Sequence, residues 1–175
     1  MKRGFTLIEM LIVLFIVSGS LLIAFPSWKE IQHKQLFEQE QNRLFLFLRR
    51  AQMRVAQSQQ IWLLIVSKDR VKHTWCLSVQ VKAEDRCDCL ASAHCGPQNT
   101  AIFYYPNSAL HSMLISKHVY PKETSRLNGI RDTLETSCFT LQAGNLRVVF
   151  SLFNVGSIKL KKHQSLSACE TATRY

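Results

Sequence analysis

An apolar run near the N-terminus is the feature that most constrains this chain. Residues 5–26 contain a single charged side chain, Glu9. As an α-helix, a segment of this length would be about 30 Å long, which matches the hydrocarbon core of a bilayer. Lys2 and Arg3 precede the run, so the positive-inside rule predicts a cytoplasmic N-terminus. We therefore expect a transmembrane helix over residues 5–26, with the rest of the chain on the other side.

Two alternatives fit an apolar N-terminal run: a secretory signal peptide and a plain membrane anchor. A signal peptide would carry a small-x-small cleavage site after the run, where this chain has Phe25-Pro26-Ser27-Trp28 instead. A small residue, Gly4, stands before the run. Pro26 is expected to kink the helix at the end of the segment. The pattern therefore does not favour removal of the whole run.

The segment Lys2-Arg3-Gly4-Phe5-Thr6-Leu7-Ile8-Glu9 resembles the signature of the type IV prepilins. That signature is a short basic leader ending in glycine, a cleavage site before Phe or Met, and a glutamate at the fifth mature position. Pro26 falls at mature position 22, where many pilins also carry proline. The resemblance implies that a prepilin peptidase removes residues 1–4 by cutting between Gly4 and Phe5, and methylates the new amine of Phe5.

The same resemblance implies a location and partners. It places the chain in the inner membrane as a single-pass protein, with its C-terminal domain in the periplasm or in a pilus or pseudopilus. Its partners would be other pilin or pseudopilin subunits and the inner-membrane assembly platform. Residues 5–26 would serve as the assembly helix, in which Glu9 and Pro26 are the expected assembly residues.

Glu9 also has a physical reading of its own. A carboxylate within a membrane segment is costly and usually has a partner. After cleavage the amine of Phe5 would lie four residues upstream, about one helical turn away. The resemblance favours the amine of a neighbouring subunit as the partner. The alternative is that Glu9, close to the helix end, reaches the water at the membrane surface.

Residues 27–60 are expected to continue the helix in amphipathic form. No glycine or proline interrupts them, and apolar residues recur at spacings near 3, 4 and 7. We expect this stripe to pack on a sheet, with residues 45–47 well buried, and the arginines at 43, 49, 50 and 54 to form a solvated face. The stripe consists of Trp28, Ile31, Phe37, Leu44, Leu48, Ala51 and Val55.

Beyond residue 60 the composition becomes typical of strands and turns. Short β-branched or alternating segments are bounded by polar turns, and residues 106–136 are ambiguous, with one candidate strand at 113–120. The sequence thus predicts an α+β fold of the type IV pilin kind, in which the long N-terminal helix packs on an antiparallel sheet within a periplasmic β domain over residues 61–175. The expected strands are 61–67, 73–82, 101–105, 137–142, 146–153 and 157–161.

All six cysteines follow the apolar run, and an even number in an exported domain favours disulfides. Six cysteines allow 15 connectivities. We expect bridges that pin the loop 83–100 to Cys76 and join Cys138 to Cys169. A metal site at Cys87-Asp88-Cys89 with His94-Cys95 fits zinc spacing poorly, so no metal or other cofactor is expected. The cysteines are Cys76, Cys87, Cys89, Cys95, Cys138 and Cys169.

A second resemblance comes from the later motifs. Thr74-Trp75-Cys76-Leu77 and the segment 148–160 are similar to the minor pseudopilins of the GspH/FimT group, and more narrowly to prepilin peptidase-dependent proteins of the A type. That group usually carries a late Gly-Arg-x-Arg motif. Here the motif reads Gly156-Ser157-Ile158-Lys159, so the first arginine is missing.

The formal net charge of +10 allows an anionic partner but does not select one. Lys159, Lys161 and Lys162 are the candidate DNA contacts, because lysines bind phosphates without sequence preference. The resemblance supports this choice, since some proteins of the FimT type are DNA receptors. The alternative is a solvated edge strand, on which lysines deter aggregation.

No arrangement of nucleophile, base and acid stands in a recognised motif, so the chain is not expected to be an enzyme. The resemblance implies a minor subunit that starts or caps a filament for DNA uptake in competence or for pilus biogenesis. A type II secretion pseudopilin and a DNA-binding tip subunit are the alternatives.

Overall fold

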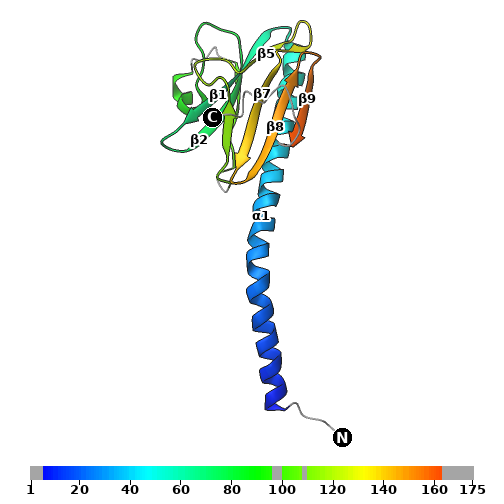
Figure 1. Ribbon diagram of the computed structural model, residues 1–175. Helices are drawn as coiled ribbons and strands as arrows, with labels where there is room; N and C mark the ends of the chain where they lie inside the picture. The colour runs from blue at the N-terminus through cyan, green and yellow to red at the C-terminus, as the bar shows by residue number, and fades with distance from the viewer. Residues whose placement is uncertain (1–5, 96–99, 108–109, 163–175) are drawn as a thin grey trace. The chain divides into compact units, whose positions relative to one another are not determined.

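The computed structural model describes residues 6–95, 100–107 and 110–162, without the side chains of residues 22–27, 92–94 and 162. It comprises a helix, α1 (Leu7–Ser58), followed by short strands (Figure 1). The chain divides into two compact units, residues 1–36 and 37–175. Each unit is described by itself.

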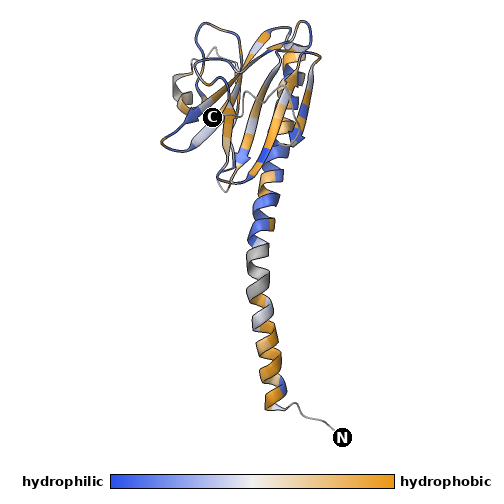
Figure 2. Cartoon of the chain, in the orientation of Figure 1, coloured by the Kyte–Doolittle hydropathy of each residue, from blue (hydrophilic) through white to orange (hydrophobic). Residues whose placement is uncertain are grey.

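The first unit contains the N-terminal part of α1. Thr6 caps the helix, since the backbone N–H of Glu9 donates to the Thr6 carbonyl (3.1 Å) and to its Oγ1 (3.4 Å). The helix continues through Pro26 as one element. Hydrophobic residues dominate its beginning (Figure 2). Even so, no helix in the described part of the chain is both long enough and apolar enough to cross a membrane. The transmembrane helix expected over residues 5–26 stays a prediction.

The second unit begins with the last part of α1, whose apolar stripe is buried. The expected stripe is confirmed from Phe37 onward, where each of its members is at most 5% exposed. The prediction of burial is wrong for Trp28 (66% exposed) and Ile31 (54% exposed), which belong to the first unit. Leu46, expected to be buried, is 51% exposed. Positions two residues apart do not share a helix face, so Leu46 points away from the stripe that includes Leu44. The buried stripe residues are Phe37, Leu44, Leu48, Ala51 and Val55.

Two antiparallel sheets complete the second unit. The first has the order β3-β2-β1-β5-β6, and the second has the order β4-β7-β8-β9 (Figure 1). The strands of the first sheet are β1 (Ile61–Asp69), β2 (Thr74–Val81), β3 (Ala101–Tyr104), β5 (Ser125–Asn128) and β6 (Thr133–Leu134). Those of the second are β4 (Met113–Ser116), β7 (Ser137–Ala143), β8 (Leu146–Phe153) and β9 (Ser157–Lys162).

The expected strands match β1, β2, β3, β7, β8 and β9 to within two residues at each end. The candidate strand at 113–120 is shorter, since β4 ends at Ser116. Sequence patterns did not identify β5 and β6. Trp62 of β1 pairs with Leu127 of β5, and this pairing joins segments more than sixty residues apart. Both strands are too short for a periodicity to show: β5 is a strand through its long-range pairing with β1, and β6 through its pairing with β5.

The central strands of the first sheet, β1 and β2, are buried on both faces. On one face Trp62 meets α1, and its indole Nε1 donates to Ser58 Oγ at 2.7 Å. The cysteine loop covers the other face, with a 3₁₀ helix, η1 (Cys89–His94), inside it. The buried amide of Gln80 holds this loop, since its Nε2 donates to the Cys87 carbonyl (3.2 Å) and its Oε1 accepts from the Cys87 N–H (2.9 Å).

The second sheet has an apolar core face. Phe139 of β7 and Phe150 of β8 are cross-strand partners with stacked rings 5.1 Å apart, and neither is exposed. Leu114 and Leu141, another cross-strand pair, lie on the same face by register. The expected hairpin is confirmed. It turns at Gly144, whose φ of 56° is a conformation that glycine adopts without steric cost.

Candidate functional site

The N-terminal segment is the first candidate site. Gly4 and Phe5, the expected cleavage and methylation residues, lie outside the described residues. Glu9 is exposed in the first turn of α1. Sequence reasoning missed a local role for it: Thr6-x-x-Glu9 is the pattern of a capping box, and its Thr6 half is formed. Glu9 can therefore stabilise the start of the helix as well as pair with an amine.

Apolar side chains of this segment have no cover within the first unit. Leu7 is 81% exposed and Phe15 is 79% exposed, and the other large apolar residues up to Leu21 are at least half exposed. Full burial of one such side chain contributes about 1.5–3 kcal/mol. The segment can therefore gain much free energy from an apolar environment.

The polar residues of this segment suit such an environment. The hydroxyl of Ser18 donates to the Phe15 carbonyl (2.9 Å), and that of Ser20 donates to the Ile16 carbonyl (2.8 Å). Both hydroxyls thus have an acceptor within the helix and need none outside it. Gly19 lies between them, and a Cβ there would meet nothing within 4 Å. This small residue leaves room for the close approach of another helix.

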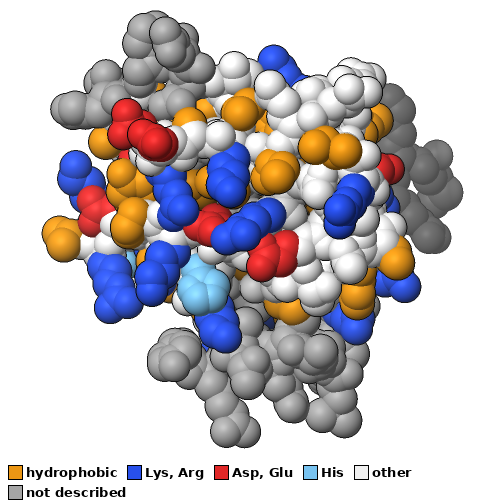
Figure 3. All heavy atoms as spheres, turned by 90° about the horizontal axis from the view of Figure 1, so that it is seen from above, with side chains coloured by type: hydrophobic (Ala, Val, Ile, Leu, Met, Phe, Trp, Pro, Cys, Tyr) orange, Lys and Arg blue, Asp and Glu red, His pale blue; other side chains and the backbone are white. Residues whose placement is uncertain are grey.

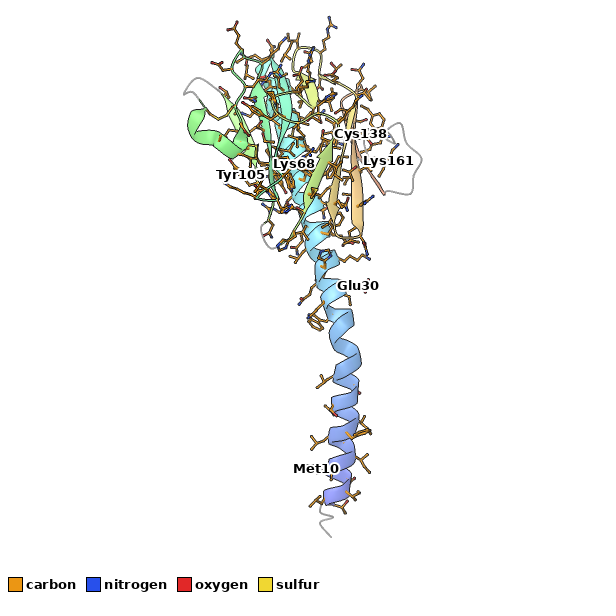
Figure 4. All side chains as sticks on the ribbon, turned by 60° about the vertical axis from the view of Figure 1, so that its left-hand side comes forward. Met10, Glu30, Lys68, Tyr105, Cys138 and Lys161 are labelled. Carbon is orange, nitrogen blue, oxygen red and sulfur yellow. A yellow bond between two sulfur atoms is a disulfide. The ribbon has the colours of Figure 1, made fainter. Side chains whose placement is uncertain are left out.

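The lysine edge, Lys159 and Lys161 of β9, is the second candidate site. Their Nζ atoms lie 5.6 and 5.8 Å from the ring centroid of Phe153. Alternate residues of a strand share a face, so both lysines lie on one side of β9, where Figure 4 labels Lys161. Lys162 pairs with Val148 in the backbone register, and its side chain lies outside the described part. The structure thus brings two of the three predicted lysines together.

Elsewhere on the surface of the second unit, basic and acidic side chains lie close together. Figure 3 shows basic and acidic side chains interspersed with apolar ones on the face that it presents. Glu123 pairs with Arg86 at 2.9 Å and with Arg126 at 2.8 Å. The hydrogen bond from Arg126 lowers the pKa of the Glu123 carboxyl, helped by the charge of Arg86. A face of paired charges attracts a polyanion less than unpaired lysines do.

A buried polar cluster joins α1 to β3, and sequence reasoning did not find it. Glu40 is 1% exposed and accepts hydrogen bonds from the Tyr104 hydroxyl (2.7 Å) and the Asn107 N–H (3.3 Å). Arg43 pairs with it at 3.2 Å. Burial, followed by the hydrogen bond to Glu40, raises the pKa of Tyr104. The sequence did carry a signal of this burial: Glu40 follows Phe37 by three residues and therefore lies on the same helix face as the apolar stripe.

The cysteines form disulfides, as their number predicted. Cys76 is joined to Cys89 and Cys87 to Cys95, with Cα–Cα distances of 6.1 and 5.2 Å. The loop 83–100 is thereby pinned to β2 through Cys76. Cys138 is disulfide-bonded as well, whereas Cys169, its expected partner, lies outside the described residues.

A metal site at these cysteines is a poor fit. Ligand atoms of Cys76, Asp88 and Cys89 lie within 4.8 Å of one another. The two sulfurs are joined in one disulfide, however, so neither is a thiolate that could bind a metal. This part of the loop therefore serves to hold the chain together.

Comparison with known proteins adds to this geometry. Residues 1–25 match the family described as "Prokaryotic N-terminal methylation motif". An uncharacterized protein of Haemophilus influenzae is 46% identical over 169 residues, which cover 97% of this chain and 99% of that protein. The chain belongs to the family of that protein and is a type IV prepilin-like protein. No solved structure matches this prepilin-like chain.

The motif assigns a general role to the N-terminal segment. A type IV prepilin motif implies processing by prepilin peptidase and interaction with other pilin subunits. The match ends at residue 25, so it says nothing of the second unit. The α+β arrangement of that unit, with a helix packed on antiparallel sheets, is consistent with a pilin-like fold.

Proposed function

We propose that this prepilin-like protein is a minor type IV pilin or pseudopilin subunit that helps start or cap a filament. The observation that carries the proposal is the methylation motif followed directly by a helix with exposed apolar side chains. Such a helix is stabilised when it lies in lipid before assembly and among the helices of other subunits afterwards. In this proposal the chain is a substrate of the peptidase and a structural component, without catalytic activity of its own.

The subgroup and the machine are finer parts of the proposal. The likeness of Thr74–Leu77 and residues 148–160 to the GspH/FimT group supports a minor rather than a major subunit. As a minor subunit, the chain would serve a filament for competence or for pilus biogenesis. A type II secretion pseudopilus is the alternative. The inner-membrane assembly platform would then be a partner, and the second unit would lie in the periplasm.

Processing is the first test. The full chain is co-expressed with a prepilin peptidase, and the mass of the purified protein and of its N-terminal peptide is measured. We expect loss of residues 1–4 and one methyl group on Phe5. The variant Gly4→Asp should keep the leader, while Gly19→Ala, a change outside the leader, should be processed normally. An unprocessed native chain would contradict the proposal.

The machine is tested by uptake of labelled DNA in a strain lacking this gene, compared with the same strain carrying the gene on a plasmid. If uptake falls and returns on complementation, the subunit serves a competence filament. If uptake is unchanged while export of secreted enzymes falls, the pseudopilus assignment replaces it.

DNA contact is a second candidate function, supported by the lysine edge. Two cations on one strand face beside the aromatic ring of Phe153 form a small basic surface, which fits weak binding to phosphates without sequence preference. The opposing reading is an edge strand that lysines protect from pairing with another chain.

The second function is tested with the full chain in nanodiscs of uncharged lipid and fluorescent double-stranded DNA at several salt concentrations. The double variant Lys159→Ala/Lys161→Ala should lower the slope of log K against log salt by up to about 2. Lys82→Ala/Lys122→Ala removes the same charge elsewhere and serves as the control. Equal binding by both double variants, or no binding at low salt, would reject this function.

A further inference from the structure

A cavity of about 230 Å³ lies where the turn between β1 and β2 meets the start of β4. Trp75 and Met113 provide its apolar wall, Lys68, Arg70 and His73 bring cationic or titratable groups to it, and Asp69 and Thr74 complete the lining. Figure 4 labels Lys68 on the second unit. The cavity belongs neither to the N-terminal segment nor to the lysine edge. It thus combines apolar surface with positive charge in one small space.

The acidic residue in the cavity lining, Asp69, is engaged by the turn itself. Asp69 Oδ1 accepts hydrogen bonds from the N–H groups of Val71 (2.8 Å) and Lys72 (3.1 Å). His73 follows with a φ of 50°, an uncommon conformation for a residue with a side chain. The carboxylate thus shapes the loop that presents the basic side chains, and it is already engaged by two donors.

The cations at the cavity are not engaged in the same way. Within the described residues, the side chains of Lys68 and Arg70 make no hydrogen bond or ion pair, whereas Arg86 and Arg126 are paired with Glu123. A cation that is not held in an ion pair can attract an anion from solution, and the three basic side chains of the lining outnumber its one carboxylate, Asp69. Lys68 and Arg70 are therefore available to an incoming anionic group.

The apolar wall offers a ring or an aliphatic chain the exposed side chain of Met113 and a small part of the surface of Trp75. Trp75 is 2% exposed, and its Nε1 donates to the Ser112 carbonyl at 3.0 Å, so the polar end of the indole is satisfied away from any ligand. Met113 is 39% exposed, and its flexible thioether adapts to different shapes. A cavity of about 150 Å³ already holds benzene in another protein. The space here accommodates a substituted ring.

From these observations we infer that the cavity binds an organic carboxylate with an apolar body. The carboxylate would lie at Lys68, Arg70 and His73, and the ring or chain would contact Trp75 and Met113. The same chemistry is offered by a free aromatic acid and by the end of a peptide whose last residue is aromatic. This inference does not rest on the filament function.

The test uses the full chain in phosphatidylcholine nanodiscs, labelled with 5-fluorotryptophan. Trp28, Trp62 and Trp75 are the three tryptophans of the chain, so ¹⁹F NMR gives one reporter in the cavity and two elsewhere. The signals are assigned with Trp28→Phe and Trp62→Phe. The probes are phenylacetate, its neutral analogue phenylacetamide, and a short peptide ending in phenylalanine with either a free or an amidated C-terminus.

We expect phenylacetate to shift the Trp75 signal alone and phenylacetamide to bind about 5-fold more weakly. Lys68→Gln/Arg70→Gln should weaken phenylacetate binding about 5- to 10-fold, and Lys82→Gln/Lys122→Gln should leave it unchanged. Binding of the free-ended peptide in preference to the free acid identifies a chain end as the ligand, and the reverse identifies a free acid.

Three results would overturn the inference. One is a Trp75 signal that stays in place at about 20 mM phenylacetate, well above a millimolar dissociation constant. Another is equal binding of the acid and the amide, which would remove the role of the cations. The third is an equal shift of all three tryptophan signals, which would show non-specific association.

Discussion

At the scale of single residues, Gly129 is the position with the least freedom. A Cβ at this position would lie 2.2 Å from the Val55 carbonyl oxygen and 2.9 Å from that of Gln60. The Gly129 N–H donates to the same Gln60 carbonyl at 2.9 Å. The end of β5 thus lies directly against the last turn of α1, and the backbone contact leaves no room for a side chain.

Gly129→Ala should therefore destabilise the second unit by about 1–3 kcal/mol or more, because backbone atoms must move to relieve the overlap. Thermal unfolding followed by near-ultraviolet circular dichroism measures the change. Gly19→Ala is the matched control: its Cβ meets nothing within 4 Å and alanine favours the helix. Equal unfolding temperatures for the two variants would contradict the close packing.

The hydrogen bond between Tyr104 and Glu40 is a second test at this scale. Tyr104→Phe leaves a buried carboxylate with one donor fewer, which should cost about 1–3 kcal/mol. Tyr105→Phe is the control, because that hydroxyl donates to the Cys89 carbonyl from a ring that is 49% exposed. Urea unfolding of both variants measures the difference, and a larger loss in the control would contradict the assignment.

The stabilising effect of Tyr104 depends on pH in a defined direction. Because burial raises its pKa in the folded chain, the folded state keeps the proton that the unfolded state loses near pH 10. The difference in unfolding free energy between the native chain and Tyr104→Phe should be constant below that pH. It should shrink as the pH rises further.

At the scale of elements, α1 changes its environment along its length. From Phe37 onward one stripe is buried against the sheets, while the opposite side stays in water. The buried stripe includes a charged residue, Glu40, whose partners come from β3 and the loop after it. The helix therefore owes its stability in this unit to packing and to a few specific contacts rather than to helix propensity alone.

A matched pair of leucines tests which side of α1 is buried. Leu44→Ala removes a side chain that is 0% exposed and should cost about 2–5 kcal/mol. Leu46→Ala, two residues further and 51% exposed, should change stability by about 0.5 kcal/mol or less. The midpoints of urea unfolding of the two variants measure the two losses of stability. Similar losses would restore the expectation that residues 45–47 are all buried.

At the scale of the whole molecule, the two units differ in how far their apolar side chains are covered within the unit. The second unit buries most of its large apolar residues in its own core, although Leu46 and Met53 of α1, Met113 of β4 and several residues between strands are exposed. The first leaves its apolar helix uncovered. The division at residue 37 means that changes in one unit should leave the stability of the other unaffected, since distant sites are nearly additive.

Leu14→Asn tests this independence. Leu14 is 68% exposed in the first unit, so the change should leave the unfolding temperature of the second unit within experimental error. It should reduce recovery of the full chain in the membrane fraction and in sheared filaments, because an amide replaces apolar surface that lipid or other subunits would cover. Normal recovery in both fractions would contradict an assembly role for this segment. Leu14→Ile is the conservative control.

Local pattern in the sequence was sufficient for a large part of the fold. The basic leader, Gly4-Phe5 and Glu9 identified a prepilin-like start, which the methylation motif over residues 1–25 supports. Period-2 alternation and turn residues located most strands, and period-3.6 spacing located the helix stripe from Phe37 onward. These features are local, so short stretches of sequence are enough to encode them.

Tertiary structure decided what depends on residues far apart in the chain. Pairing with β1 and β6 makes β5 a strand, and the approach of β3 to α1 brings the Tyr104 hydroxyl to the buried Glu40 as a donor. Of the 15 possible cysteine connectivities, contact between the loop and β2 selects the bridge from Cys76 to Cys89. In the same way, Met113 reaches the turn after β1 through the packing of two sheets, and the cavity exists because of that approach. Contacts of this kind follow from chain closure over long distances, which no local pattern records.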